Sequence, residues 1–291
     1  MLLFRADVSQ FLHDFESALK DLDAVLRTHP RRAQAWLMRA NILQVQGQYA
    51  EARAAAVRLV TVAPQLISVG CASGLAAVTG SARQGYAVLE ETLTRSSLAP
   101  ASERRWAHTI LAETAASLEQ TFDAERHFRA ALELEPQHAY TLAAYADFLM
   151  DQDRPMDVVR SLRGKDGPES VLLRLAWAER TISPQGGSWR ELAARLRGRL
   201  ESTDSRGEPL HRREYAMLLL RVLGQPRLAL SEAKLNWETQ KELADARILL
   251  EAAAALGDSE SARPVLNWMT ATRIEDVRLH SLARRHGSAT L

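Results

Sequence analysis

Apolar side chains recur at intervals of three and four residues along most of this chain. The spacing is clearest in four segments: Gln34–Gln46, Tyr49–Val62, Arg104–Glu119 and Phe122–Leu134. This periodicity is typical of amphipathic helices, which bury one face against a neighbour. No stretch shows a convincing alternation of apolar and polar residues bounded by hairpin turns, so a sheet is not expected. The pattern predicts an all-α protein.

The helical pattern also repeats along the chain. Prolines recur every 34 to 36 residues, at Pro30, Pro64, Pro100 and Pro136. A series of mostly small residues keeps a similar spacing, at Ala6, Ala40, Gly74, Ala112 and Ala146. A second series follows twelve residues behind the first, at Ala18, Ala52, Tyr86, Ala124 and Val158. Because the two series shift together, they indicate a unit of about 34 residues, with one insertion in the segment Thr94–Ser102.

Each unit is expected to form two antiparallel helices. Small residues in both helices allow the two backbones to approach, and the proline near the end of the unit stops the second helix. A unit of this kind cannot bury its apolar face alone, so its neighbours must stack on it. The sequence therefore predicts an α-solenoid of antiparallel helix pairs.

The best-preserved unit, residues 33–66, resembles a tetratricopeptide repeat. It carries residues typical of that family at nine positions: Trp36, Ala40, Leu43, Gly47, Tyr49, Ala52, Ala56, Leu59 and Pro64. A second unit, residues 105–138, matches at six: Leu111, Ala112, Ala124, Phe128, Ala131 and Pro136. The resemblance implies a right-handed superhelix of the bacterial helical-repeat type.

The resemblance is strong up to about residue 168 and weaker afterwards. We expect a regular array over 1–168, with units of about 1–32, 33–66, 67–104, 105–138 and 139–168. Degenerate helix pairs are expected at about 169–206, 207–242 and 243–275, followed by a C-terminal capping helix within Ile274–His286. The polar stretch Glu201–Pro209 is either a long loop inside one solenoid or a linker between two subarrays.

Composition narrows the class of protein. The 291 residues carry a formal charge of +1, too small to favour a nucleic-acid partner. A single cysteine excludes a disulfide framework and a zinc site built from several thiolates. No apolar run is long enough for a membrane span. Localisation stays open: cytoplasmic by default, or periplasmic or envelope if an N-terminal signal segment is missing from this chain.

Catalytic motifs are not found. The sequence has no phosphate-binding glycine loop and no nucleophile elbow, and its eight histidines lack the spacing of zinc enzymes. We interpret the histidines as surface residues, solvated or hydrogen-bonded. We therefore expect a protein that is not an enzyme and has no cofactor and no metal.

In the family that this chain resembles, the first helix of each unit lines a concave groove. The corresponding candidate groove residues here are Gln34, Leu37, Asn41, Gln44, Cys71, Leu75, Trp106, Thr109, Glu113, Tyr140 and Asp147. This groove is amide-rich at one end, apolar in the middle and acidic further along. The family's clamp for acidic C-terminal tails needs a lysine where Leu37 stands. The better-matched partner is a protein or peptide with a basic or amide-rich segment beside an apolar anchor.

The sequence thus favours a non-catalytic scaffold or adaptor that binds a protein or peptide on its concave face. Trp106 and Tyr140 are the expected apolar anchors. Two alternatives stay open: a regulatory or sensor domain that binds a small molecule, and an accessory module of a larger protein. The candidate groove residues could also be simply solvated.

Overall fold

The computed structural model describes residues 1–205 and 211–287. Helices make up 78% of the chain, no strand occurs in those two ranges, and seventeen α-helices pack against their neighbours in sequence. This confirms the predicted all-α solenoid. None of the described helices is long and apolar enough to cross a membrane.

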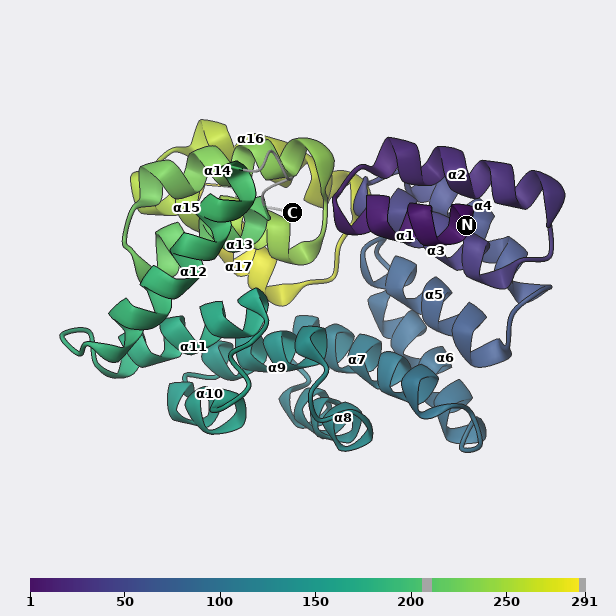
Figure 1. Ribbon diagram of the computed structural model, residues 1–291, viewed down its shortest axis with the longest axis horizontal. Helices are drawn as coiled ribbons and strands as arrows, with labels where there is room; N and C mark the ends of the chain where they lie inside the picture. The colour runs from purple at the N-terminus through teal and green to yellow at the C-terminus, as the bar shows by residue number, and fades with distance from the viewer. Residues whose placement is uncertain (206–210, 288–291) are drawn as a thin grey trace.

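The helices follow one another with short connections (Figure 1). Their bounds are α1 Leu2–Phe11, α2 Phe15–Thr28, α3 Ala33–Val45, α4 Tyr49–Val60, α5 Gln65–Ala77, α6 Ala82–Arg95, α7 Ala101–Ser117, α8 Thr121–Leu134, α9 Ala139–Asp151, α10 Pro155–Leu162, α11 Glu169–Ile182, α12 Ser188–Ser205, α13 Arg212–Met217, α14 Pro226–Thr239, α15 Leu243–Leu256, α16 Ser259–Thr272 and α17 Val277–Arg284.

The recurring small residues lie inside the helix pairs. Ala40 and Ala52 are 3% and 0% exposed, and Ala112 and Ala124 are both fully buried. Because an alanine adds little volume, the two helices of each pair approach closely at these positions. The turns between them use left-handed backbone where needed, as at Gly47, which has φ +76°.

The C-terminal half keeps the pairing but departs from regular α-helix at one point. The segment Leu218–Val222 forms a π-helix directly after α13. Of the polar stretch that the sequence left open as a loop or linker, Glu201–Ser205 belongs to α12, and 206–210 lies outside the described residues. The helix expected within Ile274–His286 is α17.

The solenoid closes on itself, because α14–α17 return to the first helix pairs (Figure 1). Trp268 Nε1 donates a hydrogen bond to the Tyr49 hydroxyl at 2.7 Å, and the Lys241 backbone N–H donates to the Val45 carbonyl at 2.7 Å. We call this contact between the two ends of the array the closure seam.

Apolar packing and a second polar contact extend the closure seam. Leu75 and Val78, at the end of α5, belong to one buried cluster with residues of α13–α17. Nearby, the Arg83 backbone N–H donates to the Glu275 carboxylate at 3.1 Å. Repeat units normally contact only their neighbours, so these contacts come from the accumulated curvature of the array.

Candidate functional site

The candidate groove residues fall into three groups by exposure. Gln34 and Tyr140 are exposed. Six others are partly buried: Leu37, Asn41, Gln44, Trp106, Glu113 and Asp147. Cys71, Leu75 and Thr109 are buried, at 4%, 4% and 2% exposure.

The three buried residues contact neighbouring helices and not solvent. Cys71 packs in an apolar cluster with Ala40 and Leu59, and burial raises the pKa of its thiol to about 12. Leu75 packs at the closure seam. The Thr109 hydroxyl lies 3.0 Å from the Thr141 hydroxyl, inside the contact between α7 and α9.

Trp106 is mainly a packing residue. Its indole covers Gly70 of α5 so closely that a Cβ built on that glycine would lie 2.6 Å from the ring atom Cζ3. The ring also packs against the cluster that contains Cys71. The indole therefore joins α7 to α5.

Tyr140 differs from Trp106 because 54% of its surface is exposed. It lies in the first turn of α9, and its hydroxyl donates a 2.7 Å hydrogen bond to the Glu113 carboxylate on α7. This bond fixes the direction of the ring. The ring is thus exposed and held in place at the same time.

The Glu113 carboxylate lies in an environment that disfavours its charge. Burial is the main cause, and the negative charges of Glu242 and Asp147 act in the same direction. The hydrogen bond from Tyr140 and the charge of Arg213 oppose them. The net effect raises the pKa of Glu113 to about 7, so the carboxyl group titrates near neutral pH.

The negative charge of Asp147 on α9 is compensated by Arg174. Arg174 of α11 donates to both of its carboxylate oxygens, at 2.7 and 3.0 Å. Burial by itself would raise the pKa of Asp147, but the charge and hydrogen bonds of Arg174 outweigh it and lower the pKa. Because Arg174 is only 5% exposed, this pair links α9 to α11 and leaves few polar atoms for a ligand.

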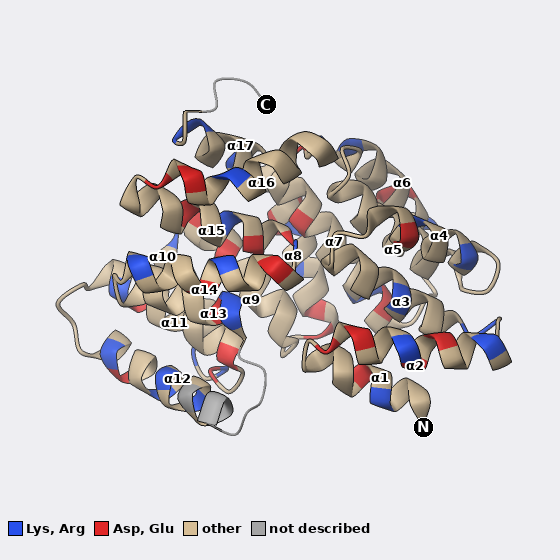
Figure 2. Cartoon of the chain, turned by 90° about the horizontal axis from the view of Figure 1, so that it is seen from above, with Lys and Arg blue, Asp and Glu red and all other residues tan. Residues whose placement is uncertain are grey.

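Further ion pairs continue along the same side of the solenoid. Arg213 of α13 donates to Glu242 at 2.6 Å and to Asp245 at 3.4 Å. Burial raises the pKa of Asp245 to about 6, although Arg213 pulls it down. Figure 2 shows acidic and basic positions next to one another around α13 and α15. We call the surface formed by α7, α9, α11, α13 and α15 the inner face.

At one end of the inner face, ion pairs join α9 to the chain's own C-terminal helices. Asp151, at the end of α9, forms ion pairs with Arg247 of α15 and Arg278 of α17. The Asp151 side chain is only 7% exposed. The open part of α9 is therefore its N-terminal end, where Tyr140 lies.

His127 differs from the expectation of surface histidines. His127 is 1% exposed, and its Nδ1 lies 2.9 Å from Nδ1 of His108. The other ring nitrogen of His127 lies 3.1 Å from the Tyr86 hydroxyl. The two histidines are nineteen positions apart, on the two helices of one pair, so spacing along a single helix gave no signal for this contact.

Within residues 1–205 and 211–287, no group of three His, Cys, Asp or Glu side chains is arranged to hold a metal ion. Comparison of the chain with protein-family models and with curated proteins found no match.

Proposed function

We propose that this chain is a non-catalytic scaffold of the tetratricopeptide-repeat type, and that it binds a peptide or protein at the open part of the inner face. The observation that carries the proposal is the pair Tyr140 and Glu113. An aromatic ring with 54% of its surface exposed is held in place by a 2.7 Å hydrogen bond to a neighbouring helix.

A ring held in this way suits an interface anchor. Tyrosine offers a large apolar surface, and only a few rotatable bonds must be ordered when a partner binds. Because Glu113 already orients the hydroxyl, part of this ordering cost is met before binding. Tyr140 therefore supplies affinity, whereas the residues around it set specificity.

Glu113 defines the chemistry of the partner. Its pKa of about 7 means that it is partly ionised near neutral pH, and Glu242 and Asp147 add negative charge nearby. A lysine, arginine or amide group of a partner would donate to this carboxylate and favour its ionised form. We therefore propose a partner segment with a basic or amide-rich stretch beside an apolar residue that contacts Tyr140.

The ion-paired end of the inner face limits the length of the segment. Since α15 and α17 pair with Asp151, a ligand would cross the N-terminal end of α9 and the part of α7 that carries Glu113. A ligand bound in this way does not extend along the whole inner face. A short segment of a few residues fits the proposal better than a long helix.

The test is a screen of a random peptide library against the folded chain, followed by titration of the selected peptides. We expect peptides that combine a basic residue with an apolar one, and Tyr140→Ala should weaken their binding about tenfold or more. Tyr140→Phe keeps the ring and should lose less affinity. Phe122→Ala, which removes a ring that is 80% exposed at the start of α8, is the matched control.

Selected peptides that bind Tyr140→Ala and the unchanged chain equally would contradict the proposal, as would a screen that enriches only acidic peptides. Circular dichroism of each variant establishes that the helices are intact.

A further inference from the structure

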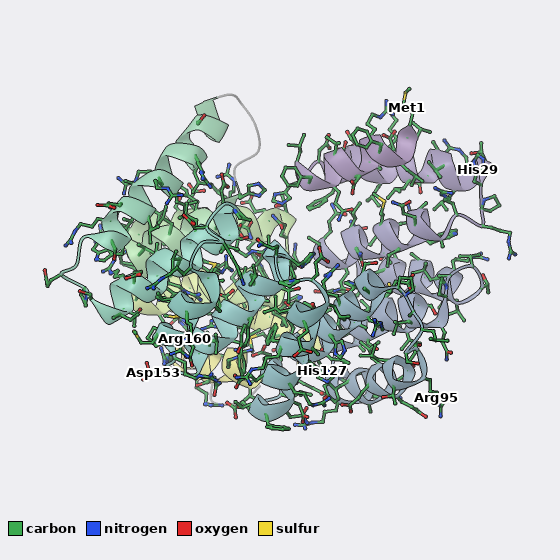
Figure 3. The ribbon with its side chains drawn as sticks, turned by 60° about the horizontal axis from the view of Figure 1, so that its bottom comes forward. Met1, His29, Arg95, His127, Asp153 and Arg160 are labelled. Atoms are coloured by element: carbon green, nitrogen blue, oxygen red, sulfur yellow. The ribbon has the colours of Figure 1, made fainter. Side chains whose placement is uncertain are left out.

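A polar hollow of about 620 Å³ lies between α6, α7 and α8, apart from the Tyr140 site. Its walls carry charged, imidazole and hydroxyl groups from Glu90, Glu91, Thr94, Ser97, Arg104, His108, Arg126 and His127. Figure 3 shows His127 and Arg95 on the lower side of the molecule, away from Met1 and His29.

The acidic groups of the hollow already have partners. Glu90 accepts a hydrogen bond from Arg126 at 2.7 Å and from the Tyr86 hydroxyl at 3.2 Å. Glu91 accepts from Arg95 at 2.5 Å. Arg126 also donates to Asp123 at 3.0 Å. The carboxylates are thus compensated before any ligand enters, and they offer little to a cation.

Arg104 is different, because it has no carboxylate partner among the residues that the structure describes. Its Nε donates to the Ala99 carbonyl at 3.1 Å, which orients the guanidinium group. The two terminal nitrogens of the guanidinium group remain as donors on the wall of the hollow. A planar cationic fork of this kind matches the oxygens of a phosphate, sulfate or carboxylate.

The hydrogen bonds of the neighbouring histidines fix where their protons lie. The Tyr86 hydroxyl donates to Glu90, so the 3.1 Å contact between Tyr86 and His127 needs a proton on Nε2 of His127. Nδ1 of His127 is then an acceptor, and the 2.9 Å contact between the imidazoles needs a proton on Nδ1 of His108. This leaves Nε2 of His108 as an acceptor that can take up a further proton.

We propose that this hollow binds a small oxyanion, the phosphate or carboxylate group of a small molecule, between Arg104 and a protonated His108. Binding places the proton on Nε2 of His108, so that both residues donate hydrogen bonds to the anion. No covalent step is involved.

Charges around His108 explain why the protonation depends on the anion. The neighbouring groups are Tyr86, Glu90, Glu91 and Arg95 on α6, Arg104 on its own helix, and Asp123, Arg126 and His127 on α8. Burial lowers the pKa of His108, and the charges of Arg126 and Arg104 lower it further. An anion between Arg104 and His108 offsets these charges and favours the imidazolium form.

Isothermal titration calorimetry with sulfate and with acetate tests the proposal. Sulfate keeps one charge state between pH 5.5 and 8, so a pH dependence of its binding reports on the protein. We expect affinity to rise as the pH falls, by at most about tenfold per pH unit, because one proton is taken up on binding. Tighter binding of sulfate indicates a ligand with a phosphate group, and tighter binding of acetate indicates a ligand with a carboxylate group.

Arg104→Gln should weaken binding of the stronger probe about tenfold or more, through loss of a charge-assisted contact. Arg104→Lys keeps the positive charge but loses the planar guanidinium group. Its affinity for the probe should lie between that of Arg104→Gln and that of the unchanged chain. Arg53→Gln makes the same charge change on the exposed face of α4 and should leave binding unchanged. His108→Gln should remove the pH dependence.

Three results would overturn the proposal: no binding of either probe, equal binding by Arg104→Gln and the unchanged chain, or sulfate affinity that is the same at pH 5.5 and pH 8. Thermal unfolding of each variant shows whether it is folded. If Arg104→Gln is not folded, the affinity of Arg104→Lys decides whether Arg104 binds the anion.

Discussion

Asp151 and Arg247 lie 96 positions apart in the sequence and form an ion pair, in which Nη1 of Arg247 donates to Oδ2 of Asp151 at 2.8 Å. The pair joins the end of α9 to α15. Arg278 of α17 contacts the same carboxylate. Together with the closure seam, this contact turns an array of neighbour-to-neighbour pairs into a closed body whose inner face is open only in part.

Removal of the Asp151 carboxylate should therefore destabilise the C-terminal helices. Asp151→Ala removes this partner from two partly buried guanidinium groups, of which Arg247 keeps its pair with Glu251, at a cost of about 1–3 kcal/mol. Denaturant unfolding measures the loss, and faster amide hydrogen exchange in α15 and α17 locates it. Arg95→Ala, which breaks an exposed pair with Glu91, should change the stability by less than about 1 kcal/mol. Equal effects of the two substitutions would show that Asp151 does not hold the closure.

Two glycines with similar backbone conformations distinguish the effect of the contact at the closure seam from the effect of left-handed backbone alone. Gly80 and Gly257 have φ +73° and +66°, so an alanine at either position costs about 1–2 kcal/mol. A Cβ at Gly80 would also lie 2.8 Å from the Arg273 carbonyl oxygen, whereas one at Gly257 meets nothing within 4 Å. Gly80→Ala should thus cost roughly 1–3 kcal/mol more than Gly257→Ala in thermal or denaturant unfolding. A smaller or equal loss for Gly80→Ala would contradict the observed contact.

A second glycine pair tests the packing role of Trp106. Gly70→Ala places a methyl group against the indole and should destabilise the chain by about 1–3 kcal/mol. Gly74→Ala, four residues later in α5, meets nothing within 4 Å and should stabilise the helix by about 0.5–1 kcal/mol. Denaturant midpoints of the two variants should therefore move in opposite directions. Midpoints that move together would mean that Trp106 does not cover Gly70.

The stability of the chain should depend on pH through Glu113. Its pKa is raised in the folded state from 4.5 to about 7, so the folded chain binds this proton more tightly than the unfolded chain. The resulting penalty is absent below pH 4.5, grows between pH 4.5 and pH 7, and reaches about 3 kcal/mol above that range. Glu113→Gln should accordingly be more stable than the unchanged chain at pH 8.

The advantage of Glu113→Gln should shrink towards zero as the pH falls to 4.5. Glu51→Gln on the exposed face of α4 is the control for loss of one carboxylate. A stability difference between Glu113→Gln and the unchanged chain that is the same at pH 5 and pH 8 would rule out the raised pKa.

The repeat pattern was enough to predict the helices, because it reports contacts between neighbouring helices. Ala40 and Ala112 recur where two backbones meet, and both are buried as expected. The repeat pattern does not predict the closure seam, because the seam joins helices that are far apart in the sequence. Gly80 and Arg273 each lie in a local turn with left-handed backbone, and their contact depends on small rotations added over many units.

The exposure of individual candidate groove residues is hard to predict for a similar reason. A position in the unit indicates which face of a helix a residue occupies, and Tyr140 is indeed exposed. It does not indicate how deeply a neighbouring helix covers that face, so Cys71 and Thr109 were expected in the groove and are buried. His127 was expected at the surface, but its polar partners lie on α6 and α7 and make burial possible.

Closure of the solenoid is tested most directly by the nuclear Overhauser effect between the Trp268 indole N–H and the ring protons of Tyr49. The two residues are 219 positions apart, and the indole nitrogen lies 2.7 Å from the Tyr49 hydroxyl oxygen. A cross-peak between them that disappears in Tyr49→Ala is the expected result. Its absence, with both resonances assigned in folded protein, would mean that the array is open at the closure seam.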